Sequence, residues 1–154
     1  MKNSLIILIT LAFAAACNTA DNKTDTETDK HMQDSLAAVK RNQILQDTSN
    51  VTTIQWLDST YIDMGKVKDG QVVEVSFRFK NSGNKPLVIT NVSASCGCTI
   101  PERPEQPFAP GEEGVIKAKF DSKGRPGVNT KQVYVTANSV PNSFQLSFTV
   151  DVTQ

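Results

Sequence analysis

The chain has 154 residues, with 16 Lys and Arg residues balanced by 16 Asp and Glu residues. This length suits one domain with room for an extra tail, and the zero net charge gives no support for a nucleic-acid partner or an anionic membrane surface. With 3 cysteines and 1 histidine, the chain lacks the residues of a disulfide-rich scaffold or an ordinary zinc site. We therefore expect no metal and no cofactor.

Residues 1–16 have the pattern of a lipoprotein signal peptide. A short basic start at Lys2 precedes an apolar run, residues 5–13, that is too short to span a bilayer as a helix. Small residues then lead to Cys17, as in a lipobox, although Ala14 stands where Leu is usual. We predict that Cys17 becomes the first mature residue and carries a diacylglyceryl group. The alternative is ordinary cleavage that leaves Cys17 as a free thiol.

This anchor predicts where the protein works. A lipid on Cys17 would attach the chain to a membrane of the cell envelope, and it would leave Cys96 and Cys98 as an even pair in an oxidising compartment. Asn18 follows Cys17 and no dense acidic run follows it, so we expect the outer membrane, facing the periplasm, rather than surface display.

Residues 17–50 are predicted to be a lipidated N-terminus and flexible tether. Residues 18–32 are rich in Asp, Thr and Asn and show no apolar periodicity, so they cannot bury a core. Residues 33–47 place Leu36 and Val39 at near-helical spacing, which supports a short, marginal helix at best. We expect it to act as a fraying spacer more than as a docking element.

From residue 51 onward the pattern is that of β-strands. Apolar and polar residues alternate over 73–80, 116–121 and 144–152, as in strands with one wet face, and further strands are expected at 52–57, 87–92 and 133–138. Turn-forming residues separate these segments at 81–84, 110–111 and 121–127. About seven short strands in about 100 residues predict an all-β fold, an immunoglobulin-like antiparallel β-sandwich over residues 51–154.

Several short motifs follow one another in a characteristic order. They are Asp63-Met64-Gly65, the segment 77–83 (FRFKNSG), the segment 86–89 (PLVI), the segment 95–99 (SCGCT) and Pro110-Gly111. Over residues 52–138 this order resembles the domain of unknown function 1573 family, common in Bacteroidota lipoproteins. Met64 stands where Phe is frequent, and Met is an adequate apolar filler there. The resemblance implies an Ig-like sandwich related to ASH and Hydin-type domains in a Gram-negative envelope, and it implies no activity, because the family's role is not established.

Cys96-Gly97-Cys98 is the group of residues that could carry chemistry, and three interpretations stay open. The first is a structural pair, either packed thiols or a disulfide, with Gly97 permitting a bend. The second is a redox-labile disulfide, strained unless the backbone bends and closing a loop too small to add much stability. The third is soft-metal binding, for which two thiolates are few and no Met or His is near in sequence.

We expect a non-enzymatic binding or scaffolding module whose partner is an envelope protein. His31 lies in the predicted tether, outside the core, so the chain offers no support for Ser-His-Asp catalysis. The candidate partner-binding loop combines Gly97, Thr99 and Phe108, around the cysteine pair and the proline-rich segment 101–110. The alternative is a thiol-redox or soft-metal accessory protein that acts through Cys96 and Cys98.

Overall fold

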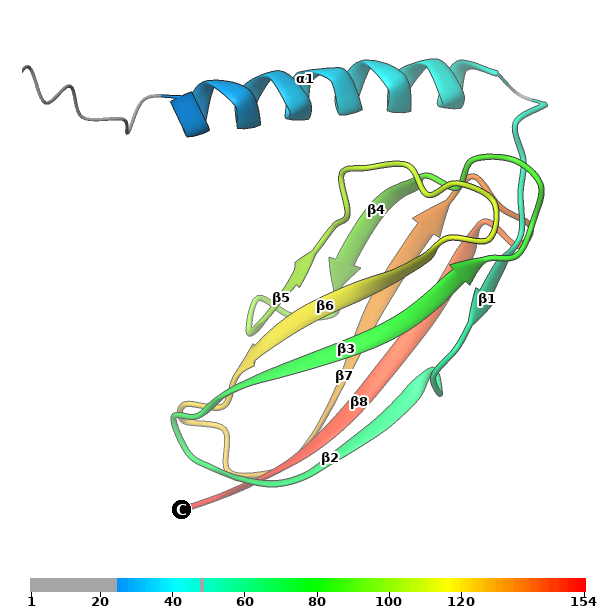
Figure 1. The fold of residues 1–154 in the computed structure, drawn as a ribbon. Helices are drawn as coiled ribbons and strands as arrows, with labels where there is room; N and C mark the ends of the chain where they lie inside the picture. The colour runs from blue at the N-terminus through cyan, green and yellow to red at the C-terminus, as the bar shows by residue number, and fades with distance from the viewer. Residues whose placement is uncertain (1–24, 48) are drawn as a thin grey trace, which may run out of the picture.

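The computed structural model describes residues 25–47 and 49–154 (Figure 1). The predicted signal peptide, the predicted lipidation site Cys17 and the first part of the predicted tether lie outside these residues. The described part of the chain contains one helix, α1 (Asp25–Gln46), and eight strands. The strands are β1 (Ile54–Trp56), β2 (Tyr61–Lys68), β3 (Val72–Asn81), β4 (Ile89–Ala94), β5 (Thr99–Glu102), β6 (Glu113–Asp121), β7 (Gly127–Ala137) and β8 (Ser143–Thr153).

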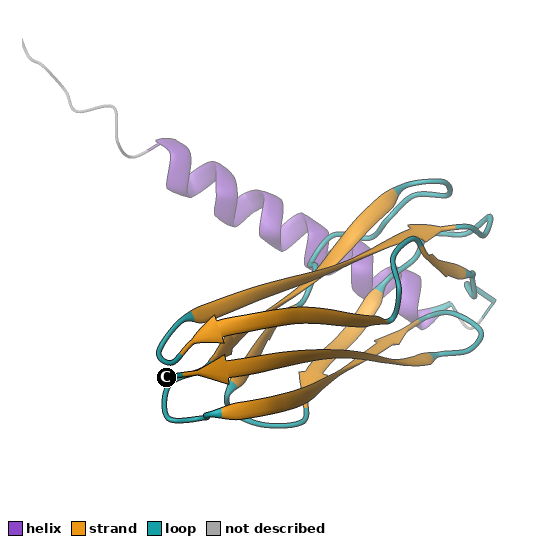
Figure 2. Ribbon diagram, turned by 90° about the horizontal axis from the view of Figure 1, so that it is seen from below, coloured by secondary structure: helices purple, strands orange, loops and turns teal. Residues whose placement is uncertain are grey.

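The strands form two four-stranded sheets that pack face to face (Figures 1 and 2). One sheet has the order β1-β3-β6-β5 and the other β2-β8-β7-β4. Alternate residues of β3, β6 and β8 are buried between them, as the period of two requires. The largest fully buried side chains include Phe77, Phe79, Phe120 and Phe148. The predicted all-β, Ig-like sandwich is therefore confirmed.

Two details of the structure differ from the predicted sandwich. The described residues form eight strands rather than about seven, and β2 pairs with β8 in parallel, so the fold is not wholly antiparallel. β2 was not expected because a bulge between Asp63 and Lys66 breaks its alternation: Ile62 and Met64 pack on the core, and then Val67 does. β5 was not expected because it has only four residues and contains Pro101, which is tolerated at a sheet edge.

Helix α1 is longer than the sequence predicted, and it contacts the sandwich. It has 22 residues and begins at Asp25, inside the segment that we expected to be flexible, and it lies across one end of the sheets (Figure 1). Over residues 32–46, where its side chains are described, the buried ones are Ala37 and Arg41, whereas Leu36 and Val39, which suggested a helix, are exposed. Tertiary contact through Ala37 and Arg41 therefore supports a helix whose own apolar pattern is weak. Among the described residues no helix is long and apolar enough to cross a bilayer.

Candidate binding surface

Cys96 and Cys98 form a disulfide in the bend between β4 and β5. Their Cα atoms are 5.3 Å apart, within the ordinary range for a disulfide, because the chain turns here and the Thr99 N–H donates to the Cys96 carbonyl at 3.2 Å. Both cysteines are half-buried, and Gly97 is exposed, with open space where a Cβ would lie. The bonded pair leaves no free thiolates for a metal. In the described part of the chain no group of three or more His, Cys, Asp or Glu side chains is placed to hold one.

Thr99 and Phe108, two residues of the predicted partner-binding loop, both have side chains that pack inward in the structure. Thr99 is buried, with its hydroxyl 3.8 Å from the Cys96 sulfur. Phe108 is fixed by two backbone hydrogen bonds to Leu87, of 2.9 and 2.8 Å, and its ring meets Phe79 edge-on at 4.9 Å between centroids. Apolar residues of a proline-rich loop pack inward when the loop closes over a sheet edge, and Phe108 does so here.

The predicted partner-binding loop is divided into two places. The disulfide bend, residues 95–98, precedes β5, and the proline-rich loop, residues 103–112, follows it. Four extended residues span about 13 Å, so β5 holds the two loops at its opposite ends. The two segments that the sequence analysis joined into one candidate loop therefore lie apart in the structure, and their role in partner binding stays a prediction.

A groove lies between the proline-rich loop and the outer edge of β6. We call it the edge groove; its volume is about 440 Å³. Gly114 allows the loop to approach closely, because a Cβ there would lie only 2.5 Å from ring atoms of both Phe108 and Phe79. The Phe108 ring therefore packs beneath β6 and supplies part of an apolar wall. The lining residues are Glu102, Arg103, Pro104, Phe108, Glu113, Gly114, Val115 and Lys117.

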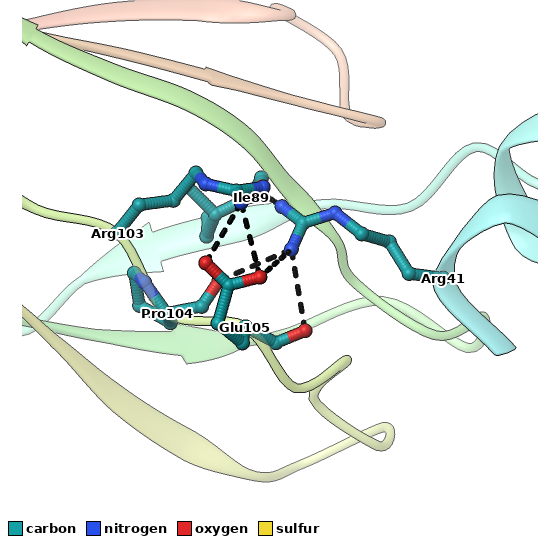
Figure 3. Close-up of polar contacts among 5 residues, drawn as sticks. All are labelled: Arg41, Ile89, Arg103, Pro104 and Glu105. Carbon is teal, nitrogen blue, oxygen red and sulfur yellow. Dashed lines mark hydrogen bonds and ion pairs between the residues drawn. The ribbon is translucent and has the colours of Figure 1, made fainter. Parts of the chain in front are cut away.

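Arg41 of α1 ties the helix to this loop and to the edge of β4 (Figure 3). Its guanidinium donates to the backbone carbonyl and the carboxylate of Glu105, each at 3.2 Å, and to the carbonyl of Ile89. Its side chain is only 7 % exposed. Burial lowers the pKa of Arg41, the charge of Arg103 lowers it further, and Glu105 opposes both effects. The guanidinium nevertheless stays charged, because its unperturbed pKa is far above neutrality.

Sequence reasoning missed Arg41 because nothing in a polar helix distinguishes its arginine from the neighbouring Lys40. The signal that was present is weak. Ala37, Arg41 and Ile44 recur at helical spacing and form the face with the least exposure, opposite Leu36 and Val39. That face identifies the docking side only once the helix is known to dock.

Two charged residues beside the edge groove, Glu102 of β5 and Lys119 of β6, are paired with one another across strands. Lys119 donates to Glu102 at 2.7 Å. The hydrogen bond to Lys119 lowers the pKa of Glu102, and the same bond raises the pKa of Lys119. Both shifts favour the charged forms, so neither group is poised to exchange a proton near neutral pH. The arrangement suits surface recognition better than acid–base chemistry.

Fold and surface together define the class: a two-layer β-sandwich of the Ig-like, PapD-like type with a helix over one end. The chain belongs to the protein of unknown function (DUF1573) family, whose sequence profile matches residues 54–152. The family predicted from the motifs is therefore confirmed. No curated protein sequence matches the chain.

Two solved structures illustrate the fold. A protein of unknown function from Porphyromonas gingivalis W83 is 17% identical with a TM-score of 0.55, and the match covers 68% of this chain and 48% of that one. The ASH/PapD-like domain 7 of human CEP192 is 8% identical with a TM-score of 0.56, covering 68% of this chain and 88% of the domain. The chain thus spans about half the length of the Porphyromonas protein, and at these identities the likeness concerns the fold alone.

Proposed function

We propose that this chain is a non-enzymatic binding module, held at the cell envelope by a lipid on Cys17, and that its partner is an envelope protein. The observation that carries the proposal is the edge groove. Its walls are the aromatic ring of Phe108, the ring of Pro104 and the strand edge of β6. A shallow groove of this kind, on a sandwich fold, provides contact area and hydrogen-bonding groups without converging catalytic side chains.

The groove is suited to binding because both of its sides are held in place. β6 is paired with β3 along all nine of its residues. The loop is fixed by the Leu87 and Phe108 backbone bonds, by Arg41, and by Asn81, whose side-chain amide donates to the Phe108 carbonyl at 3.0 Å. A surface that is already ordered loses little conformational entropy when a partner binds.

The anchor is tested by metabolic labelling with palmitate followed by membrane fractionation. We expect the wild-type chain to incorporate label and to sediment with the outer membrane. We expect Cys17→Ser to lose the label and to appear in the periplasmic fraction. A Cys17→Ser chain that keeps its label, or a wild-type chain without label, would contradict the anchor.

The partner is tested by photo-crosslinking in intact cells, with a photoreactive residue at Lys117 in the edge groove. The matched control is Val128, an exposed position on β7 in the other sheet. We expect a discrete protein adduct from Lys117 and none from Val128. Equal labelling from both positions, or no adduct from Lys117, would count against a specific binding module.

A second candidate, thiol-redox function, is favoured by the half-exposed disulfide between Cys96 and Cys98. A partner dithiol would break the S–S bond, yielding two thiols here and a disulfide on the partner. Rapid acid quenching and thiol trapping of protein from cells would then find a sizeable reduced fraction. A pair that is wholly oxidised in cells and stays so with an excess of dithiol would exclude this function.

A further inference from the structure

We infer that the edge groove binds a short extended peptide segment of the partner, which adds to the outer edge of β6 as an antiparallel strand. This inference rests on the proposed function and specifies the chemistry of its partner. It follows from the backbone directions in β3 and β6, from the point at which β5 stops, and from the side chains that line the groove.

Alternate backbone N–H and carbonyl groups of β6 point away from β3, toward the open edge. The N–H of Arg78 in β3 donates to the Asp58 carboxylate at 2.9 Å, and its carbonyl accepts from the Leu57 N–H at 2.9 Å, so both groups point away from β6. Val115 lies opposite Arg78 in the antiparallel ladder. Since directly opposite residues either share both hydrogen bonds or neither, the N–H and carbonyl of Val115 point outward, toward the side of β5. Glu113, two residues away, has the same direction.

In the described part of the chain, these outward groups of β6 have no backbone partner. The pairing of β5 with β6 ends where Glu102 faces Lys117. The residue that would next face Val115 is Pro104, which has no N–H to donate. Over residues 25–47 and 49–154, no backbone hydrogen bond reaches the outward N–H or carbonyl of Val115 or Glu113. An unpaired edge of this kind binds extended peptides by strand addition.

The side chains that line the edge groove determine which residues such a peptide needs. A residue opposite Gly114 would project inward beside the Phe108 ring and Pro104, so it should be apolar. A residue opposite Glu113 would lie on the outer face next to its carboxylate, which in the described structure forms no ion pair, so it should be Lys or Arg. A residue opposite Val115 should be β-branched. The order along the peptide is β-branched, apolar, basic.

A segment of another protein suits the edge groove better than a segment of this chain or a second copy of it. Glu102 fills the rung beside Lys117, so the segment must begin or bend at Val115, which suits a chain end or loop of another protein. Residues 18–24 of this chain, NTADNKT, lack the required pattern. In a second copy paired through β6, Glu113 would face apolar Val115 rather than a base. A segment that pairs with β6 over only three residues buries a small area, so the complex should be transient.

The test is an NMR titration of the ¹⁵N-labelled full chain carrying Cys17→Ser. The probe is the synthetic peptide acetyl-valyl-leucyl-lysyl-serine amide. We expect saturable shifts of the amide signals of Val115 and Glu113. Peptides N-methylated on valine or on lysine should bind about tenfold more weakly or worse, because each loses an amide that faces β6. The peptide N-methylated on leucine, whose amide faces away, should bind within about twofold of the parent.

Two protein variants give an independent check. Val115→Pro removes the outward N–H without removing a bond to β3, and Val115→Thr keeps that N–H and serves as the matched control. We expect binding to be lost in the first and kept in the second. Glu113→Lys should reverse the preference between lysine and glutamate in the third peptide position. The N-methyl series keeps the inference testable even where Val115→Pro misfolds, because the peptide alone is changed.

The outcomes separate the inference from the proposed function. Equal weakening by all three N-methyl groups, shifts at another edge, or no binding overturns strand addition. Concentration-dependent broadening of the β6 signals without peptide shows that a second copy occupies the edge, and it also overturns the inference. If a Lys117 crosslink captures a partner while the peptide fails, the binding function stands and the strand-addition mode falls.

Discussion

At the scale of single residues, Gly114 decides how the loop meets the sheet. The space where its Cβ would lie is occupied by ring atoms of Phe79 and Phe108, each 2.5 Å away. Any other residue would push one ring outward, and Phe108 is the one held by a loop. The shape of the edge groove therefore depends on residue 114 being a glycine, whose side chain is a single hydrogen atom.

We predict that Gly114→Ala lowers the free energy of unfolding by about 1–3 kcal/mol, because the added methyl overpacks two aromatic rings. Denaturant unfolding of both chains measures the difference. Gly97→Ala is the control, since open space surrounds that position and its φ is not left-handed; it should change stability by less than about 0.5 kcal/mol. If both substitutions are equally mild, Phe108 has freedom to move, and the groove is not fixed as described.

At the scale of elements, Arg41 makes the polar contacts that hold α1 against the sandwich. Arg41 is buried, and its guanidinium donates to the carbonyl of Ile89 on the edge strand β4. That carbonyl would otherwise be buried without a donor. Covering the edge with a charged group from a helix also hinders pairing with another chain at β4.

We predict that Arg41→Ala releases α1 from the sheets. It leaves the backbone carbonyls of Ile89 and Glu105 without their donor, at a cost of about 1–3 kcal/mol, while Arg103 still donates to the Glu105 carboxylate. Hydrogen exchange should become faster for amides of residues 34–46 and stay unchanged in β8. The neighbouring Lys40 is exposed and also basic, so it provides the control, and Lys40→Ala should leave the pattern as in the wild type. Unchanged exchange in both variants would show that Ala37 and its neighbours hold the helix without Arg41.

A second prediction at this scale concerns Asp58, which follows β1 and whose side chain binds Arg78 at the edge of β3. Its carboxylate accepts the Arg78 N–H and the Arg78 guanidinium at 2.7 Å, and these hydrogen bonds lower the pKa of Asp58 below the ordinary 3.8. The stability it contributes is present above that ordinary value and is lost as the pH falls through the lower folded-state pKa. Asp58→Asn should be less stable than the wild type at pH 7, and the thermal melts should converge only when the pH falls below the lowered folded-state pKa of Asp58. Melting curves that stay equally separated at every pH would contradict this role.

The predictability of the elements follows from their burial. β3, β6 and β8 alternate strictly because one face of each meets the core, and the sequence predicted all three. β2 was not predicted because its bulge shifts the buried positions from one set of alternate residues to the other. β5 was not predicted because four residues, one of them proline, are too few to show an alternating pattern. The parallel pairing of β2 could not be predicted, since it depends on which edge of β8 is left free.

The candidate surface was predictable only in part, for a related reason. The Cys96 and Cys98 pair and Phe108 stand out in the sequence by residue type. The edge groove does not stand out. It arises because the pairing of β5 with β6 ends at Lys117, two residues from Val115, and this depends on strand register rather than on composition. Arg41 is hidden in the same way, since its partners Ile89 and Glu105 are far from it in sequence.

At the scale of the whole molecule, the sandwich is complete without the helix. The residues of the core cluster all lie between Ile54 and Val152, close to the span of the family match, and the described side chains of α1 contribute none of them. The connection that matters for the sandwich begins at Asn50, whose carbonyl accepts the Asn138 side-chain amide at 2.7 Å. The helix therefore behaves as an addition to a self-sufficient domain.

We predict that a chain of residues 49–154 folds on its own, with cooperative unfolding and a melting temperature within about 8 °C of the full chain, since it loses on the order of 1 kcal/mol of net docking energy. Circular dichroism should show the loss of helical signal and the retention of the β signal. The peptide titration of Val115 and Glu113 should be unchanged if the loop keeps its place without Arg41, and weaker if α1 shapes the groove by holding Glu105. A shortened chain that aggregates or melts without cooperativity would show instead that α1 is a structural part of the domain, with Arg41 its principal contact.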